Sequence, residues 1–462
     1  MGGGILQLIY IGEQNLYLTE NPQVTFFKMM YRRHTNFSID TRQENFTTAI
    51  SFGQRSQCVL SKDGDLLYRL GIHIKLSSLN TQFQNKSNSN SCNSDKNCLC
   101  MCPNCLLDKD DKLIYGWANA IGHVLLEYIE FRIGGCIIDR QYGEWMEIWT
   151  ELSQTAEKRL GYYEMIGKKD PLSYTVDSFT GAMDLFIPFT FWFCRNVGAS
   201  IPCVALKYHD IEVIVKFRDF DNCWVTNKEN AVKPKATIDA QLYADYIYLG
   251  LDERHKFAHE THVYLIEQVQ LSENNAYNTN TGTAKILLEF NHPIKSLYWI
   301  VQRDDVTGPP DGVLKDDPSY PKGNDWFNFT SSKNPRSEHL IETFTEAMLQ
   351  FNGDDRFQYY FPAFYFRKYH PYHYHTRVPT ANYIYNYNFG WQPEELPPTG
   401  TCNFSRIKDS QFVLRLGQRD YNNNHTGHIG KKNKHGVNIR MYGLGYNFLV
   451  ISAGLGAVMF SN

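Results

Sequence analysis

Alternating apolar and polar positions recur along the chain and predict β-strands. Apolar and charged residues alternate over Ile129–Ile133, which places one face of a strand in a core and the other in solvent. The Gly134–Gly135 pair that follows predicts a hairpin turn, because glycine tolerates the positive φ of a tight turn. Residues 211–217 show the same alternation. Residues 263–266 and 294–301 are largely apolar and predict strands buried on both faces.

One segment has the period of a helix instead. From Tyr142 to Leu160, apolar residues stand at i, i+3, i+4 and i+7 and form one stripe. They are Trp145, Ile148, Trp149 and Leu152, and the acidic residues Glu144, Glu147 and Glu151 fall off the stripe. Gly161 predicts the end of this helix. A shorter helix is predicted from Asp252 to Glu260.

Three polar stretches predict long loops, because their Asn, Ser, Asp, Gly and Pro content offers little to bury. They are residues 81–112, 303–324 and 421–436. Long loops on a strand-rich frame are typical of β-sandwiches and jelly rolls. Residues 219–238 mix charge with few strand signals and lie near the midpoint, so they predict a linker between two halves.

Composition supports a folded, strand-rich protein. Of 462 residues, 42% are hydrophobic and 21% are charged, which argues against intrinsic disorder. Aromatic residues make up 15%, mostly 30 Tyr and 29 Phe, and these residue types favour pleated surfaces. Lys and Arg number 46 and Asp and Glu 49, so the net charge is −3. Without a surplus of positive charge, the chain is a poor candidate for wrapping nucleic acid.

The C-terminal stretch from Met441 to Asn462 carries no charge and is long enough to be compared with a membrane span. Asn447, Ser452 and four glycines argue against a span, so the stretch predicts a buried strand followed by a glycine-rich tail. The N-terminus lacks the basic start and apolar core of a signal peptide. We therefore expect a soluble, unsecreted protein.

Four cysteines crowd into eight residues and form the candidate metal site. They are Cys98, Cys100, Cys102 and Cys105. The last two have the CxxC spacing of zinc ligands, but a single compressed cluster is a weaker signal than two separated CxxC pairs. A structural zinc, disulfides and free thiols all remain open for this loop. We expect no other cofactor.

Two histidine groups are candidate metal or catalytic sites. His255, His259 and His262 fall at i, i+4 and i+7, on one face of a short helix, but His259 and His262 are one residue closer than the HExxH motif requires. A packed or solvated helix face is the favoured interpretation. His370, His373 and His375 alternate with tyrosines and predict an aromatic packing segment.

Motifs for catalysis are absent from the sequence. No G-x-S-x-G elbow, P-loop or dinucleotide fingerprint occurs, so we expect a protein that is not an enzyme. Asn-x-Ser/Thr sequons make candidate glycosylation sites, which matter only if glycosyltransferases reach the protein. They stand at Asn36, Asn45, Asn85, Asn328, Asn403 and Asn424.

Short segments spread along the chain, in order, resemble the major capsid proteins of nucleocytoplasmic large DNA viruses. In the first half they are GILQL at 4–8, NPQVTFFK at 21–28, YRRHTNF at 31–37, IDRQYGEW at 138–145, PFTFWFCRN at 188–196 and ALKYHD at 205–210. In the second half they are YLIEQV at 264–269, FNHP at 290–293, YHTRVP at 374–379, PEEL at 393–396, TCNFSR at 401–406 and FSN at 460–462. The Cys-rich loop matches no motif of that family.

The resemblance implies an all-β fold, a tandem double jelly roll of two eight-stranded antiparallel sandwiches with a few short helices in loops. It divides the chain into an N-terminal inner-face segment (1–25), a first jelly roll (26–220), a linker (221–240) and a second jelly roll (241–462). It also implies a homotrimer that forms a pseudo-hexagonal capsomer and tiles the icosahedral outer shell of a large double-stranded DNA virus.

The partners that the resemblance implies are other copies of the chain, penton proteins and minor capsid proteins. The N-terminal segment, apolar and without a basic cluster up to residue 18, is expected to face minor capsid proteins or the internal viral membrane. The expected location is the virion shell, assembled in host cytoplasm, without direct contact to nucleic acid. The alternatives are a glycan-binding jelly-roll surface protein, since jelly rolls are also lectin scaffolds, and a capsid-like minor or scaffold component.

Overall fold

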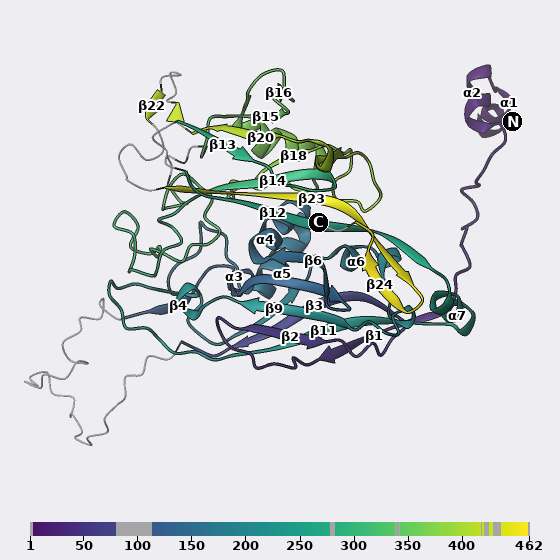
Figure 1. Cartoon of the computed structure of the whole chain (residues 1–462). Helices are drawn as coiled ribbons and strands as arrows, with labels where there is room; N and C mark the ends of the chain where they lie inside the picture. The colour runs from purple at the N-terminus through teal and green to yellow at the C-terminus, as the bar shows by residue number, and fades with distance from the viewer. Residues whose placement is uncertain are drawn as a thin grey trace, which may run out of the picture. The chain divides into compact units, whose positions relative to one another are not determined.

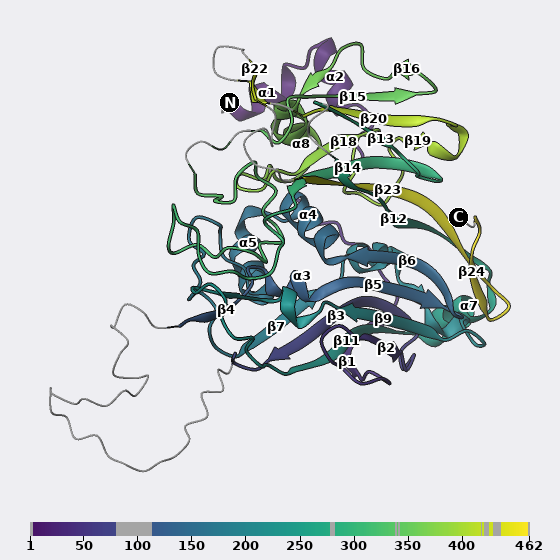
Figure 2. The ribbon, with the colours of Figure 1, turned by 60° about the vertical axis from the view of Figure 1, so that its left-hand side comes forward.

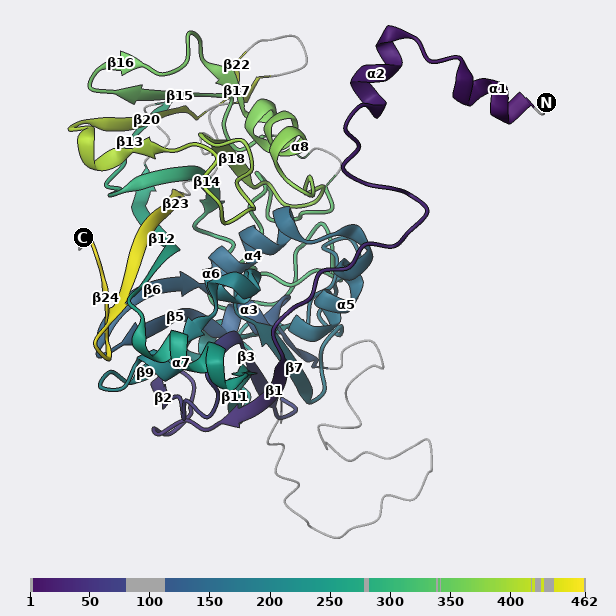
Figure 3. The ribbon, with the colours of Figure 1, turned by 90° about the vertical axis from the view of Figure 1, so that its right-hand side faces the viewer.

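The computed structural model describes residues 3–79, 113–277, 282–337, 340, 342–416, 418–419, 425–427 and 436–460. The chain divides into two units, Met1–Phe37 and Ser38–Asn462. The first unit has two short helices, α1 (Gly3–Ile9) and α2 (Glu13–Thr19), and an extended segment after them (Figure 3). None of the described side chains from Gly3 to Asn36 is buried. The second unit contains two antiparallel β-sandwiches.

The first sandwich joins a five-stranded and a four-stranded antiparallel layer (Figure 1). One layer has the order β1 (Phe37–Glu44), β11 (Ile238–Leu249), β3 (Leu66–Leu76) and β7 (Met183–Pro188), with β8 (Ile201–Pro202) also paired to β3. The other has the order β2 (Arg55–Val59), β9 (Ile211–Phe217), β5 (Leu126–Ile133) and β6 (Cys136–Tyr142). A two-stranded ribbon of β4 (Tyr115–Trp117) and β10 (Trp224–Thr226) completes it.

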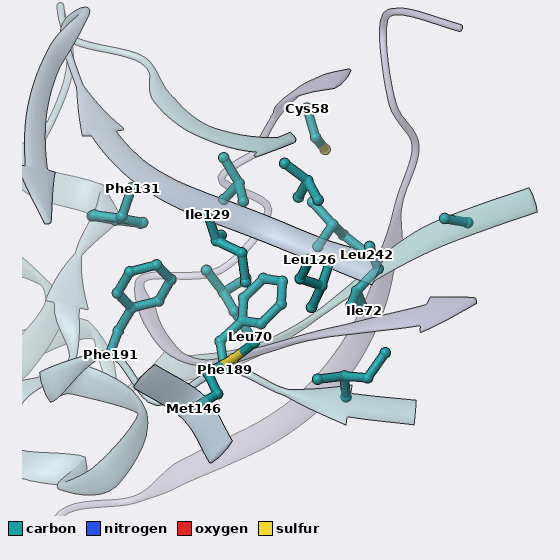
Figure 4. Packing of buried hydrophobic residues seen from close by; sticks show 14 of the residues in the cluster. Cys58, Leu70, Ile72, Leu126, Ile129, Phe131, Met146, Phe189, Phe191 and Leu242 are labelled. Atoms are coloured by element: carbon teal, nitrogen blue, oxygen red, sulfur yellow. The ribbon is translucent and has the colours of Figure 1, made fainter. Parts of the chain in front are cut away.

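Alternation places the apolar side chains of both layers in one core, as Figure 4 shows for Leu70, Ile129, Phe131 and Leu242. Strand β9 contributes Ile211, Val213, Val215 and Phe217, all buried, which confirms the strand predicted at 211–217. The predicted hairpin is also confirmed. Gly134 and Gly135 connect β5 to β6 with φ values of 57° and 80°, which fit the tight turn that favours glycine.

The second sandwich repeats the arrangement. One layer has the order β12 (His262–Tyr277), β23 (Val437–Ser452), β14 (Pro293–Arg303) and β18 (Tyr385–Asn388), with β19 (Cys402–Asn403) on β14 and β24 (Leu455–Val458) on β23. The other has the order β13 (Thr283–Leu287), β20 (Ser410–Arg415), β15 (Glu346–Phe351) and β16 (Asp354–Asp355), with β17 (Phe361–Pro362) on β15. A short pair, β21 (Gln418–Arg419) and β22 (His425–Gly427), lies apart from both.

Aromatic rings fill the core of the second sandwich. Trp299 of β14 is fully buried, and its ring lies 4.7 Å from Phe412 and 5.1 Å from Phe366 between centroids. The strands predicted at 263–266 and 294–301 are confirmed within β12 and β14. The uncharged C-terminal stretch is also confirmed as a strand, because β23 pairs with β12 on one side and β14 on the other. Among the described residues, no helix has the length and apolar character that crossing a membrane requires.

The single helix predicted from 142 to 160 is wrong, because the chain forms α4 (Gly143–Ser153) and α5 (Ala156–Ile166). Gln154 and Thr155 between them are extended, and Gly161 lies inside α5, which ends instead at Gly167 with a φ of 65°. The break has a packing reason. The apolar stripe of α4 belongs to the core of the second sandwich, whereas Tyr162 and Ile166 of α5 belong to the first.

The linker predicted at 221–240 is also wrong. Trp224 and Val225 are buried in β10, and β11 pairs with β3 from Ile238 onward, so this stretch completes the first sandwich. The sequence did not reveal these two strands, because charged residues of the surrounding loops interrupt the apolar pattern. The connection to the second sandwich is α7 (Leu251–His259), which confirms the shorter predicted helix.

The remaining helices and turns are short. They are α3 (Ile121–Leu125), α6 (Trp192–Arg195), α8 (His370–Tyr374), the 3-10 turns η1 (Val197–Ala199), η2 (Cys203–Ala205), η3 (Phe220–Asn222) and η6 (Phe404–Arg406), and the π-helical turn η5 (Tyr365–Tyr369). The loop predicted at 303–324 is confirmed, with one isolated bridge between Val313 and Pro321. The predicted loop 81–112 lies outside the described residues, as does most of 421–436.

Candidate assembly interfaces

Helix α4 lies between the two sandwiches and contributes to both cores (Figure 2). Met146 packs into the first core, where Figure 4 shows it near Phe189, while Trp145 and Trp149 pack into the second. The Trp145 ring lies 5.3 Å from Tyr298 of β14, edge to face, which is a favoured aromatic geometry. We call the contact between α4, β6, α6 and the β12–β23–β14 sheet the seam.

An ion pair crosses the seam between helix and sheet. Nε of Arg440 on β23 donates to Oε2 of Glu144 at 2.6 Å, and its Nη2 donates to Oε1. The Tyr442 hydroxyl also donates to Glu144 Oε2 at 2.6 Å, and Gln302 accepts a further bond from Arg440. A two-point guanidinium–carboxylate contact fixes orientation as well as distance. Glu144 therefore ties α4 to β23 in one geometry.

A second buried carboxylate holds two cations at the seam. Glu267 of β12 accepts from Arg195 of α6, in the first sandwich, and from Lys295 of β14. Burial lowers the pKa of Lys295 to about 8, although the charge of Glu267 favours the ammonium form. Loss of Glu267 would remove the carboxylate that both cations contact, which is far costlier than losing an exposed pair.

Asp139 of β6 makes the third link. Its Oδ1 accepts the backbone N–H of Val269 on β12 at 3.0 Å, and its Oδ2 accepts from Gln141 at 3.0 Å. Burial raises the pKa of Asp139 to about 7, although these hydrogen bonds favour the carboxylate. The Gln268 amide of β12 donates back to the carbonyl of Ile138. Strands β6 and β12 are thus bonded across the seam in both directions.

A buried polar network extends the seam to α3 and to Lys168, which follows α5. Glu147 accepts from Nδ1 of His123 at 2.8 Å, from Lys168 and, at 3.4 Å, from Asn382 of the second sandwich. Burial opposes its ionisation, but Lys168 and His123 outweigh burial and lower the pKa of Glu147 to about 2. Glu151 pairs with Arg377 at 3.0 Å, which adds a second bond to that sandwich.

Perturbed pKa values often mark catalytic sites, but structural ion-pair networks perturb them too. The carboxylates of the seam have their partners within the chain, and each set links elements far apart in sequence. The ion pairs and hydrogen bonds of the seam can hold the two sandwiches at a fixed mutual orientation. Sequence reasoning missed these residues. The available signal was the charge of Glu267, Lys295 and Arg440 within otherwise apolar strands.

The candidate metal ligands Cys98, Cys100, Cys102 and Cys105 lie outside the described residues. The six cysteines that the structure describes are free thiols. Within the same part of the chain, no three His, Cys, Asp or Glu side chains gather in a way that fits a metal ion.

The structure places the two histidine groups in different surroundings. The rings of His255 and His259 stack on α7 at 5.8 Å, and His262 contacts the carbonyl of Phe257 through Nε2. His370 and His375 are buried on and just after α8, and Nδ1 of His375 lies 2.9 Å from Glu394.

The sequons differ in accessibility. Asn36, in the first unit, is exposed, and so are Asn45 and Asn403 in the second. Asn328 does not suit a glycosylation site, because it is 4% exposed and its amide donates to the carbonyls of Ser332 and Lys333. Asn85 and Asn424 lie outside the described residues.

Both halves of the chain match families of viral major capsid proteins. Residues 25–250 match the family described as major capsid protein N-terminus, and residues 253–457 match the family described as large eukaryotic DNA virus major capsid protein. The boundary between the two matches falls at α7, in agreement with the end of β11 at Leu249.

Full-length relatives agree. The chain is 31% identical to the major capsid protein of Chrysochromulina ericina virus and 32% identical to that of Pyramimonas orientalis virus, with 100% of both chains covered in each case. It is 28% identical to the major capsid protein of Paramecium bursaria Chlorella virus 1, again over 100% of both chains.

Solved structures show the same fold. PBCV-1 VP54 superposes with a TM-score of 0.72 and 25% identity, covering 95% of this chain and all of that one. The Faustovirus major capsid protein, at 12% identity and a TM-score of 0.68, covers 96% of this chain and 94% of its own and supports the fold alone. The double jelly roll expected from the resemblance is confirmed. The chain belongs to the major capsid proteins of large eukaryotic DNA viruses.

Proposed function

We propose that three copies of this chain assemble into a pseudo-hexagonal capsomer, and that these capsomers tile the icosahedral outer shell of the virion. The observation that carries the proposal is the seam. Because α4 and the Glu144–Arg440 pair fix the two sandwiches together, each chain presents two similar rigid blocks. Three such chains around a threefold axis place six blocks in a ring, and closed cyclic symmetry is the usual arrangement of soluble homo-oligomers.

Exposed aromatic residues of the second unit supply contact area for this assembly. Phe186, Tyr208 and Phe364 are exposed on different elements of the two sandwiches. Aromatic residues are enriched in interfaces between protein subunits, and obligate interfaces often bury about 2,000 Å² or more. These residues suit contacts within and between capsomers.

The first unit suits a contact on the inner face of the shell. Its described apolar side chains are exposed, including Phe26, Phe27 and Met29, and exposed apolar clusters mark interaction sites. We assign them to minor capsid proteins or to an internal viral membrane. Penton proteins are expected at the fivefold vertices, and assembly is expected in host cytoplasm. The chain itself is proposed to have no enzymatic activity and no direct contact with nucleic acid.

The trimer is tested by light scattering coupled to size exclusion on the purified full chain. We expect one species with three times the 53.7 kDa mass of the chain and, in negative-stain micrographs, a six-lobed outline. A protein that remains monomeric at high concentration would contradict the proposal.

The inner-face contact is tested by flotation with anionic liposomes. The double variant Phe26→Ser/Phe27→Ser in the full chain is expected to remain trimeric but to lose liposome association. Val232→Ser, an exposed apolar residue of the second unit, serves as the control and should float as the unaltered chain does. Equal flotation of both variants would exclude a membrane role for this segment.

The two alternative functions make different predictions. A minor or scaffold component would be scarce in purified virions, whereas the major subunit should be the most abundant protein. A glycan-binding surface protein would bind glycan arrays without forming capsomers. The full-length relatives named as major capsid proteins favour the shell subunit.

A further inference from the structure

A cavity of about 600 Å³ opens beside η5 and α8, on the second sandwich. Figure 3 shows α8 and its neighbouring turns outside the strands of that sandwich. Three tyrosines from the helical turns, Tyr365, Tyr369 and Tyr374, form part of the wall, and Trp391 from the loop after β18 completes it.

The rings in this wall are only partly packed by the protein. Trp391 is 75% exposed and Tyr369 is 56% exposed. One neighbour of the Tyr369 ring is the Tyr365 ring, which stacks on it with 5.4 Å between the centroids. Large aromatic faces that the fold leaves uncovered in a concave site are available to a ligand.

The charge of the wall is negative. Glu394 and Glu395 both line the cavity, and its described lining includes no lysine or arginine. Burial opposes the ionisation of Glu394, but hydrogen bonds from His375 and Thr376 outweigh it and lower the pKa of its carboxyl group. Glu395 is exposed and supplies the second carboxylate.

His370 does not offset this charge. Burial is the main reason that its pKa falls to about 3, and His375 and His373 lower it further, so its imidazole is neutral at neutral pH. The side chain is 3% exposed, forms part of the cavity wall, and leaves its Nδ1 without a hydrogen-bond partner.

Glu394 is already bonded to His375, which leaves the exposed Glu395 as the carboxylate available to a ligand. Aromatic faces beside an available carboxylate are the chemistry that recognises an organic cation. We propose that this cavity binds an alkylammonium or guanidinium group, with Trp391 and Tyr369 against the cation and Glu395 as its counter-charge. The cation comes either from a free polyamine or from a Lys or Arg side chain on another protein chain.

The test is isothermal titration of the full-length assembled protein at low ionic strength. Spermidine probes a free amine, and blocked tripeptides with a central Lys or Arg probe a protein side chain. The same tripeptide with a central Gln and the sugar maltose are the neutral controls. We expect spermidine, the basic tripeptides or both to bind. Binding of spermidine alone would identify a free polyamine as the ligand, and binding of the tripeptides would identify a Lys or Arg side chain.

The variant Trp391→Ala is expected to weaken binding by about three-fold to thirty-fold, the range for a cation on an aromatic face. Tyr372→Ala is the matched control, because this exposed tyrosine of α8 is not among the residues lining the cavity, and it should bind as the unaltered chain does. Glu395→Gln should weaken binding by about two-fold to five-fold and make it less sensitive to salt.

Three results would overturn the proposal. They are binding of maltose with none of either cation class, equal binding of the Gln and Lys tripeptides, and equal affinity in the Trp391→Ala and Tyr372→Ala variants. Circular dichroism of each variant confirms that the fold is retained, so a loss of affinity reports on the cavity itself.

Discussion

Arg440 of β23 binds Glu144 of α4 through two nitrogens, although 296 positions separate them in the sequence. Both side chains are largely buried, so the pair is not an exposed salt bridge. Arg440→Ala leaves the Glu144 carboxylate without its cation, and we expect it to lower the free energy of unfolding by about 3 kcal/mol. Urea denaturation measures the loss. Arg42→Ala, which breaks the exposed pair with Asp40, is the control and should change the stability far less, because an exposed ion pair is screened by water and salt.

The apolar stripe of α4 leads to a second prediction, which concerns packing in the second core. Leu152 is fully buried in the second core, whereas Leu160 on α5 is 66% exposed. Leu152→Ala is expected to lower the unfolding free energy by about 2–5 kcal/mol, because it leaves a cavity. The same change at Leu160 should cost less than about 0.5 kcal/mol. Equal thermal shifts for the two variants would show that α4 is not an essential part of the core.

The raised pKa of Asp139 predicts a pH dependence of stability. Its folded pKa of about 7 lies above the ordinary value of 3.8, so between these values the folded state binds more protons than the unfolded state. Its contribution therefore favours folding most below about pH 4, is progressively lost as pH rises from about 4 to 7, and stays constant above that. Asp139→Asn removes this titration. Unfolding free energies of the two proteins, measured from pH 4 to 8, should diverge by a pH-dependent difference, and parallel curves would contradict the assignment.

Glycan analysis of virions by mass spectrometry tests the sequons. If glycosyltransferases reach the chain, Asn45 and Asn403 are expected to carry glycans because they are exposed. Asn328 should be unmodified in every copy, since its amide is buried and already donates two hydrogen bonds. A glycan found at Asn328 would mean that the loop around it opens or is modified before folding.

The Cys-rich loop remains a prediction from sequence. We expect elemental analysis of purified protein to find up to one zinc per chain, with the metal lost in a Cys102→Ser/Cys105→Ser variant because thiolates bind zinc. Cys136→Ser, which removes an exposed thiol on β6, is the matched control and should retain the metal. Metal-free protein with the same thermal stability in chelator would exclude the zinc interpretation.

Local patterns were sufficient to predict much of the fold. The strand at 211–217 and the Gly134–Gly135 turn are visible because alternation and turn chemistry act over a few residues. The family resemblance then supplied the double jelly roll, which no local pattern contains. The linker prediction failed at Trp224 and Ile238, because charged loop residues surround the short strand β10 and precede β11, and the partner strands β4 and β3 lie far away in sequence.

The contacts of the seam could not be predicted from local sequence patterns, for a related physical reason. Glu147 and Glu151 fall off the apolar stripe of α4, a position typical of solvated residues, yet both are buried. Their partners Lys168 and Arg377 are distant in sequence, and a single sequence does not state which charges meet. The helix break at Gln154–Thr155 has the same origin, since it depends on α4 and α5 serving different cores.

The place of α4 between two cores has a consequence for synthesis on the ribosome. Glu144 emerges 296 residues before Arg440, which at roughly 5–20 residues per second is an interval of about 15–60 s. Throughout that interval the strands that cover Trp145 and Trp149 are incomplete, so a nascent chain displays indole rings to water. Chaperone occupancy of ribosome-bound chains should therefore peak after α4 emerges and fall once β23 has left the exit tunnel.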